Sequence, residues 1–209
     1  SISFKIDQHF SKQHDRNTQC WATAVLKAQS LYNIFRYRAH FSILVGLPIG
    51  LPDSKHIIDP ILKANDIANL IGVNFVLKPH PTWTETKIKS MFPLGKLDNF
   101  KFVLGDFHDN VEKANLVISN ASSVSLEALA KGVPVVIVAP PTGVIQNPIP
   151  KEVSNSIWKV IHTADQLNDA INHFNNSELI ESLIPEFKKV KNNFFEPVSK
   201  KGVQSFLNL

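Results

Sequence analysis

The chain has 209 residues, 44% of them apolar, so it can bury the core of one domain or of one and a half. No segment approaches the length of a membrane span, and nothing at the start resembles a signal peptide. A single cysteine, Cys20, excludes an internal disulfide, and no cysteine cluster suggests zinc, which fits a cytoplasmic protein.

The net charge of +4 belongs to residues 1–40, which hold six basic residues, all three Arg among them, against two acidic ones. From residue 41 onward, 16 Lys balance 16 acidic groups, and no basic groove with interleaved aromatic residues is apparent. Nucleic acid is therefore not an expected ligand. A phosphate site in this part of the chain must use Lys, His, hydroxyl and backbone N–H groups, because it lacks Arg.

Residues 1–40 are predicted to form a polar arm and a connecting helix. Apolar residues recur at helical spacing from Trp21 to Phe35, which predicts a helix at about 18–37. Its apolar face is expected to meet a surface outside the chain. The missing starting Met is typical of a fragment of a longer protein.

Strands and helices alternate from Phe41 onward. The expected strands are the apolar runs at 41–49, 73–77, 100–104, 116–119, 135–138 and 157–161. The expected helices are at 55–71, from 82 or 84 to 91, at 109–114, 123–131, 164–174, 177–192 and 198–207. Asp53 and Ser54 are candidate N-caps, and Gly132 stands where a left-handed C-cap is needed.

This alternation predicts an α/β fold, a Rossmann-like doubly wound parallel sheet of about six strands with helices on both faces. The strands are continuously apolar, as a sheet buried on both faces requires. We expect an arm at 1–40, the Rossmann-like domain at 41–176 and C-terminal helices packed on it at 177–209. Ligands bind such sheets at the carboxyl ends of the strands. The segments that fall there are 46–54, KPHP (78–81), SNASS (119–123) and APPTG (139–143).

His80 is the first candidate binding residue, because the prolines on both sides hold its backbone stiff and extended. Its ring could donate a hydrogen bond to a phosphate oxygen or a sugar hydroxyl. Lys78 projects to the same face of the strand and could add charge. The alternative is that Pro-His-Pro is only a rigid turn with His80 on the surface.

Ser122 and Ser123 open the helix that follows the strand 116–119. Free N–H groups and the helix dipole favour an anion at this position. Simple helix capping by serine is an equally good interpretation, and the two roles can coexist. One turn later, Glu127 could accept hydrogen bonds from the hydroxyls of a ribose, or it could be a solvated helix residue. The residues alone favour the solvated interpretation.

Loops at the carboxyl ends supply further candidates near a ligand. The segment 139–156 holds four of the 13 prolines and one glycine, and a long ordered loop in this place is often functional. The loop residues expected near a ligand are Pro48, Ser54, Pro81, Thr82, Asn120, Pro140, Thr142 and Gly143. His108 and Asp109 are weaker candidates, whereas Trp83 and Trp158 are expected to pack.

Several common motifs are absent. The chain has no GxGxxG after a strand, no GxxxxGK[ST] and no Gly-x-Ser-x-Gly, and no residues stand at metal-ligand spacing. Dinucleotide binding, P-loop hydrolysis and serine-hydrolase chemistry are therefore not expected, and neither is a metal or other cofactor.

Taken together, KPHP, SNASS with Glu127, and Gly132-Val133-Pro134 resemble the C-terminal domain of a GT-B type glycosyltransferase. The resemblance covers about residues 40–175, and the nearest group is the surface-carbohydrate enzymes that include bacterial polysialyltransferases and CDP-glycerol glycerophosphotransferases. It implies a nucleotide-binding domain of capsule or lipopolysaccharide biosynthesis, cytoplasmic or peripheral at the inner face of the membrane. His80, Ser122 and Ser123 would then contact the donor phosphate, and Glu127 would lie near the ribose.

The resemblance implies a nucleotide-sugar donor, with CMP or CDP favoured and UDP as an alternative, and a glycan acceptor. Enzymes of this type carry an N-terminal domain with the acceptor site and the catalytic base. Residues 1–40 are too short for such a domain. We therefore expect the chain to be a donor-binding half that is inactive alone. The competing functions are a half of a UDP-GlcNAc 2-epimerase-like enzyme and a non-catalytic binding module.

Overall fold

The computed structural model of the protein describes residues 41–68, 72–84, 86, 99–120, 122–140, 147–195 and 204. The chain divides into two compact units, Ser1–Ala39 and His40–Leu209, and every described residue lies in the second. The predicted arm with its helix at 18–37, the helix that was expected to end at 91 and the helix at 198–207 fall outside the described residues. Among the described residues, no helix is both long and apolar enough to cross a membrane.

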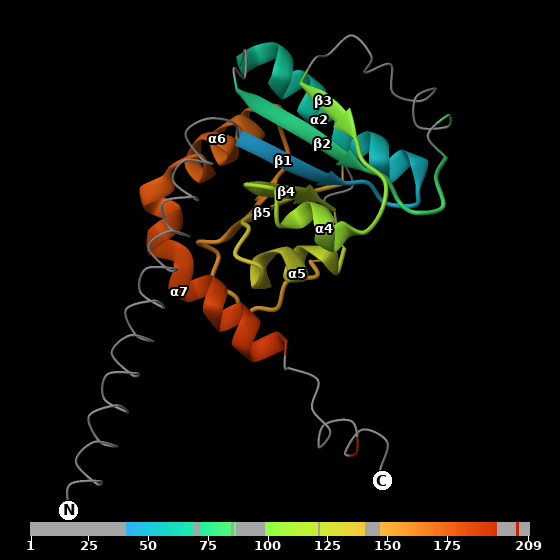
Figure 1. Ribbon diagram of the computed structural model, residues 1–209. Helices are drawn as coiled ribbons and strands as arrows, with labels where there is room; N and C mark the ends of the chain where they lie inside the picture. Colours follow the sequence, from blue (N-terminus) through green and yellow to red (C-terminus); the bar gives the residue numbers. More distant parts are fainter. Residues whose placement is uncertain are drawn as a thin grey trace, which may run out of the picture. The chain divides into compact units, whose positions relative to one another are not determined.

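The predicted α/β fold is confirmed by a single sheet of six parallel strands (Figure 1). Its strands lie in the order β3-β2-β1-β4-β5-β6. Their bounds are β1 Phe41–Gly46, β2 Val73–Lys78, β3 Phe100–Phe102, β4 Leu116–Ser119, β5 Val135–Val138 and β6 Trp158–Ile161. The central strands β4 and β5 are buried at every position, as continuous Leu, Val and Ile runs require when both faces are covered.

Helices cover both faces of this sheet. They are α2 Leu51–Ala68, α4 Phe107–Val111, α5 Val124–Ala130, α6 Ala164–Phe174 and α7 Ser177–Phe194. Helix α2 packs against α6 on one face, and α4 and α5 lie on the other (Figure 1). Helix α7 contacts both α6 and α5, so the C-terminal part of the chain closes the domain.

The helices bury apolar stripes at helical spacing against the sheet. In α6 the stripe is formed by Leu167, Ala170, Ile171 and Phe174, and in α7 by Ile180, Leu183, Phe187 and Val190. In α2 the expected Ile58 and Ile61 are buried, together with Ile57 and Ala64. Leu62, expected to face inward, is only half-buried.

Several element ends differ from the sequence prediction, among them the end of β1, which is Gly46 and not residue 49, and the first turns explain the new starts of α2 and α4. Helix α2 begins at Leu51, before the predicted residue 55, since a proline in the first turn costs no helical hydrogen bond. Helix α4 spans Phe107–Val111 instead of 109–114, because the Asp106 side chain accepts a hydrogen bond from the backbone N–H of His108 at 3.1 Å. Strand β3 ends at Phe102, before the predicted residue 104.

The predicted C-cap at Gly132 is confirmed. Its φ of 82° is in the left-handed region. The N–H groups of Gly132 and Val133 donate to the carbonyls of Leu129 and Ala128, both at 3.0 Å. This pair of bonds is the Schellman arrangement that ends a helix and turns the chain into the next strand. It sends the chain from α5 into β5.

Candidate functional site

The carboxyl ends of the central strands place the two predicted motifs on either side of β1. Strand β1 pairs with β2 and with β4, and Gly46 is level with Lys78. Val45 is opposite Ile118, so the next residues, Gly46 and Ser119, are also level. Neighbouring strands lie about 4.8 Å apart, which puts the ends of β2 and β4 roughly 10 Å from each other. The KPHP and SNASS loops therefore begin on one edge of the sheet, separated by the loop after β1.

The imidazole of His80 is held by Thr82. The Thr82 backbone N–H donates to Nδ1 at 3.3 Å, and the Thr82 Oγ1 lies 2.9 Å from the same nitrogen. Because a backbone N–H can only donate, Nδ1 acts as the acceptor, and the proton of the neutral ring is on Nε2. Nε2–H has no hydrogen-bond partner among the described residues and can donate to a ligand.

The ammonium of Lys78 is buried at the start of the same loop. The residue is 7% exposed, and its Nζ donates to the carbonyl of Pro79 at 3.0 Å. Burial lowers the pKa of Lys78, and the nearby Asp106 carboxylate partly opposes that shift. The described residues provide no second hydrogen-bond acceptor for this ammonium, which has three donors.

The loop after β1 is fixed by hydrogen bonds to three consecutive carbonyls. The Ser54 hydroxyl donates to the carbonyl of Pro48 at 3.0 Å, and the Ser54 N–H donates to that of Gly50 at 3.0 Å. The indole N–H of Trp83 donates to the carbonyl of Ile49 at 3.1 Å. Ser54 is thus a buried residue of α2 that supports the loop, and Trp83 packs as expected. The same loop leaves the Ile49 side chain 63% exposed.

The serines of the SNASS segment and of α5 point in two directions. Ser119 and Ser125 are fully buried, with their hydroxyl oxygens 2.7 Å apart, and the Ser119 hydroxyl also donates to the carbonyl of Asn120 at 3.1 Å. Ser123 is the N-cap residue of α5 but makes no side-chain capping bond. Neither Ser122 nor Ser123 has a hydroxyl partner among the residues that the structure describes. Their hydroxyls are therefore available to a ligand.

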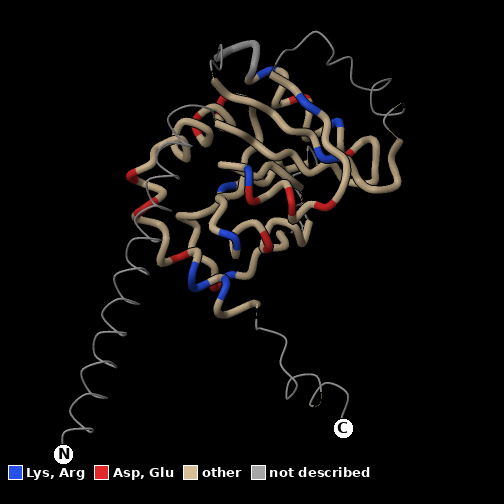
Figure 2. Tube along the Cα trace, in the orientation of Figure 1, with Lys and Arg blue, Asp and Glu red and all other residues tan. Residues whose placement is uncertain are grey.

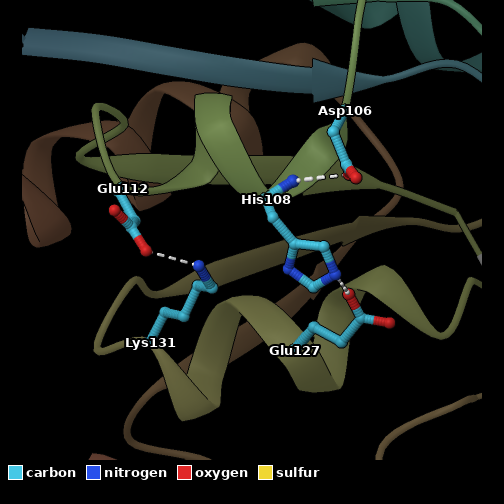
Figure 3. A network of polar contacts seen from close by, with 5 residues as sticks. All are labelled: Asp106, His108, Glu112, Glu127 and Lys131. Carbon is cyan, nitrogen blue, oxygen red and sulfur yellow. Dashed lines mark hydrogen bonds and ion pairs between the residues drawn. The ribbon is translucent and has the colours of Figure 1, made fainter.

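Side chains of α4, α5 and their C-cap residues form a network of polar contacts, of which the His108–Glu127 end lies nearer to this edge (Figure 3). Nε2 of His108 lies 3.5 Å from Oε2 of Glu127, and Nζ of Lys131 lies 2.5 Å from Oε1 of Glu112. Glu127 therefore lies within ion-pair distance of His108, a pair that is charged only when the His108 ring is protonated, whereas its sequence position favoured a solvated residue. His108 was only a weak candidate in the sequence, because nothing in the spacing links it to a residue of the following helix.

Of the predicted residues after β5, the structure describes only one. Pro140 follows β5 and is half-buried, whereas Thr142 and Gly143 lie outside the described residues. An open pocket of about 480 Å³ is lined by residues of the segment 147–158 and by none of the predicted binding residues. Within the described ranges, no three His, Cys, Asp or Glu side chains gather as a metal site would require.

Positions of basic and acidic residues are interspersed along the backbone trace of the described domain (Figure 2). This pattern agrees with the equal numbers of basic and acidic residues after residue 40. A ligand at the carboxyl edge would thus be recognised by a few local groups, because the domain as a whole carries no strong field.

No protein-family model matches the chain, and no curated protein matches its sequence. Solved structures do match. Staphylococcus aureus MnaA, in a co-structure with UDP, gives a TM-score of 0.57 at 18% identity over 84% of this chain and 48% of its own. WaaG, a glycosyltransferase involved in lipopolysaccharide biosynthesis, gives 0.55 at 17% identity over 76% and 44%. The UDP-GlcNAc 2-epimerase of Neisseria meningitidis, bound to UDP-GlcNAc, gives 0.50 at 19% identity over 90% and 49%.

These similarities show the fold. The described domain has a GT-B-like, Rossmann-type architecture, and the chain spans about half the length of these solved structures. The predicted GT-B resemblance is therefore confirmed at the level of the fold.

Proposed function

We propose that this domain binds the nucleotide of a sugar donor and serves as the donor half of a glycosyltransferase. The observation that carries the proposal is the placement of a fixed His80 ring on one side of β1 and, on the other, of two serine hydroxyls that have no partner among the described residues, at the carboxyl edge of a GT-B-like sheet. Parallel sheets of this class bind ligands at that edge. Transfer itself is assigned to this half acting together with an acceptor domain.

The donor phosphate is assigned to the gap between the two loops. Nε2–H of His80 would donate from one side, and the hydroxyls of Ser122 and Ser123 from the other. A buried Lys78 ammonium with one described hydrogen bond supports an anion nearby, since such a charge is costly unless it is paired. Preorganised donors aimed at a leaving phosphate stabilise the charge that develops there during transfer.

Glu127 is assigned to the ribose. It lies in the first turn of α5 with its side chain 29% exposed, and only one of its carboxylate oxygens has a described partner. A carboxylate can accept hydrogen bonds from both hydroxyls of a ribose. We propose that three parts of the chain form the walls of this site. They are the rigid loop after β1, the Pro81-Thr82 turn, and the loop residues Asn120, Pro140, Thr142 and Gly143.

Two observations bear on the identity of the nucleobase, and they differ. The KPHP and SNASS motifs resemble enzymes with cytidine donors, whereas MnaA and the Neisseria epimerase were solved with UDP and UDP-GlcNAc. The similarity to these two structures favours a second candidate function, one half of a UDP-GlcNAc 2-epimerase-like enzyme. The resemblance carried by residues 78–81 and 119–123 favours the transferase with a CMP or CDP donor.

A thermal-shift series with CMP, CDP, UDP, GDP and ADP tests the proposal. A nucleotide at 100 times its Kd stabilises the folded domain by about 2.7 kcal/mol, which is readily visible. We expect cytidine or uridine nucleotides to raise Tm, and His80→Ala to remove the rise. His173→Gln is the matched control and should keep it, because His173 lies in the last turn of α6, at the opposite edge of the sheet.

The outcomes separate the candidates. A response to cytidine nucleotides supports the CMP or CDP donor, and a response to uridine nucleotides alone supports the epimerase-like half or a UDP-sugar transferase. No response from any of the five nucleotides, or an undiminished response in His80→Ala, would contradict the proposed site.

A further inference from the structure

Two side-chain pairs join α4 to α5, one helical turn apart (Figure 3). In one pair the acid is Glu127 of α5 and the base is His108 of α4. In the other the acid is Glu112, which caps the C-terminus of α4, and the base is Lys131, which caps that of α5. The helices are therefore linked twice, and the acidic residue belongs to α5 in one pair and to the end of α4 in the other.

The two pairs differ in where they lie. Glu112 and Lys131 stand at the C-terminal ends of their helices, away from the carboxyl edge of the sheet. His108 and Glu127 stand near the N-terminal ends, where the helices leave the loops after β3 and β4. The Lys131–Glu112 pair can hold the two helices together, whereas the His108–Glu127 pair lies beside the proposed ligand.

The contact with His108 engages only one oxygen of Glu127. Nε2 lies 3.5 Å from Oε2, and Oε1 has no partner among the described residues. A glutamate that points freely into solvent loses rotamer freedom when it binds a ligand, and that loss weakens binding. An ion pair with His108 that restrains one oxygen reduces the loss and leaves the other oxygen for a ligand hydroxyl.

We propose that His108 is a positioning residue that holds Glu127 in place for the ribose hydroxyls and so sets a preference for ribonucleotides over 2′-deoxyribonucleotides. His108 can act in this way only if the carboxyl edge binds a nucleotide, so the proposal rests on the proposed function. His108 itself need not touch the ligand. Its effect is on the orientation of Glu127, and it should appear in sugar discrimination more than in overall stability.

The test is to measure the Kd of the full chain for UDP and CDP and for their 2′-deoxy counterparts, dUDP and dCDP, by calorimetry. A hydrogen bond to a charged group predicts a preference of about tenfold or more for the ribonucleotide in the unmodified chain. Glu127→Gln should remove most of that preference. Coupled neighbours typically change each other's effect by about twofold or more, so His108→Ala should reduce the preference by two- to tenfold.

Two further variants separate positioning from folding. His108→Gln places an amide donor close to the position of Nε2, and it should restore most of the preference. Glu112→Gln breaks the other link between the same helices and should leave the preference unchanged, with circular dichroism confirming that every variant is folded.

Each result is decisive. A preference lost in Glu127→Gln and reduced in His108→Ala, with rescue in His108→Gln, supports the positioning role. A preference that Glu127→Gln removes and His108→Ala keeps overturns it while the proposed function stands. Equal loss in Glu112→Gln and His108→Ala also overturns it, because the effect would then follow from loosened helices. Absence of binding by all four nucleotides overturns it together with the proposed function.

Discussion

At the scale of single residues, the serines of the SNASS segment and of α5 divide into a buried pair and a pair that is partly or fully exposed. Ser119 and Ser125 face inward and bond to each other at 2.7 Å, whereas Ser122 and Ser123 face outward without described partners. The inward pair anchors the start of α5 to the end of β4. It thereby fixes the position from which the outward pair would meet a phosphate.

The two buried hydroxyls should differ in their contribution to stability. The Ser119 hydroxyl donates to the carbonyl of Asn120, so Ser125 must be the donor to Ser119. Ser125→Ala removes the donor of this bond, but the Ser119 hydroxyl still donates to the carbonyl of Asn120. The substitution should therefore lower the free energy of unfolding by about 1 kcal/mol. Ser119→Ala leaves the buried Ser125 hydroxyl without its acceptor and should cost about 2 kcal/mol. Urea denaturation measures both, and an equal or reversed order would contradict the assigned direction.

At the scale of elements, the end of α5 depends on the backbone conformation of Gly132. With φ at 82°, a residue with a Cβ is strained there even though no atom lies within 4 Å of the added carbon. Gly132→Ala should therefore destabilise the domain by about 1–2 kcal/mol, and Gly132→Asn by less, because Asn tolerates the left-handed region. Urea midpoints give the comparison.

Gly46 supplies the matched control for that substitution. It lies in β1 without a positive φ, and an added Cβ would meet only ordinary contacts at 3.9 Å. Gly46→Ala should change the free energy of unfolding much less than Gly132→Ala. Similar losses from both would contradict the assignment of the cost at Gly132 to backbone strain.

The strands were predictable from the sequence because a sheet covered on both faces needs continuous apolar runs such as VVIV and LVIS. The location of KPHP and SNASS at one edge followed from the parallel topology. Side-chain directions did not follow, because they depend on tertiary packing. Lys78 and Ser54 are buried, which their polar residue types do not suggest. The His108–Glu127 pair joins two helices, a relation that no local spacing encodes.

At the scale of the whole molecule, the domain carries balanced charge, so its dependence on pH should come from individual groups. His173, in the last turn of α6, is one such group. Burial, and secondly the charge of Lys159, lower the pKa of His173 below its ordinary 6.5. Its ring lies 4.9 Å from that of Phe174, and the ammonium of Lys159 lies 5.8 Å from the Phe174 ring centroid, so the three residues form one cluster at the edge of the core.

The sign of the effect follows from proton linkage. Because the pKa of His173 is lower in the folded chain, the unfolded chain takes up the proton first as pH falls. The stability that neutral His173 contributes is therefore fully present above its unfolded pKa of 6.5 and declines as pH falls through the lower, folded value. His173→Gln should flatten the loss of stability that sets in as pH falls below about 6.5, and Lys159→Gln should flatten it in part.

Urea unfolding across this pH range measures the prediction as a slope of the unfolding free energy against pH. His162→Gln is the matched control, since it removes an exposed histidine from the loop before α6 and should keep the slope of the unmodified chain. An unchanged slope in His173→Gln would place the acid sensitivity elsewhere. A flatter slope in His173→Gln, with an intermediate one in Lys159→Gln, would assign it to the contact of α6 with β6, because Lys159 reaches His173 from that strand.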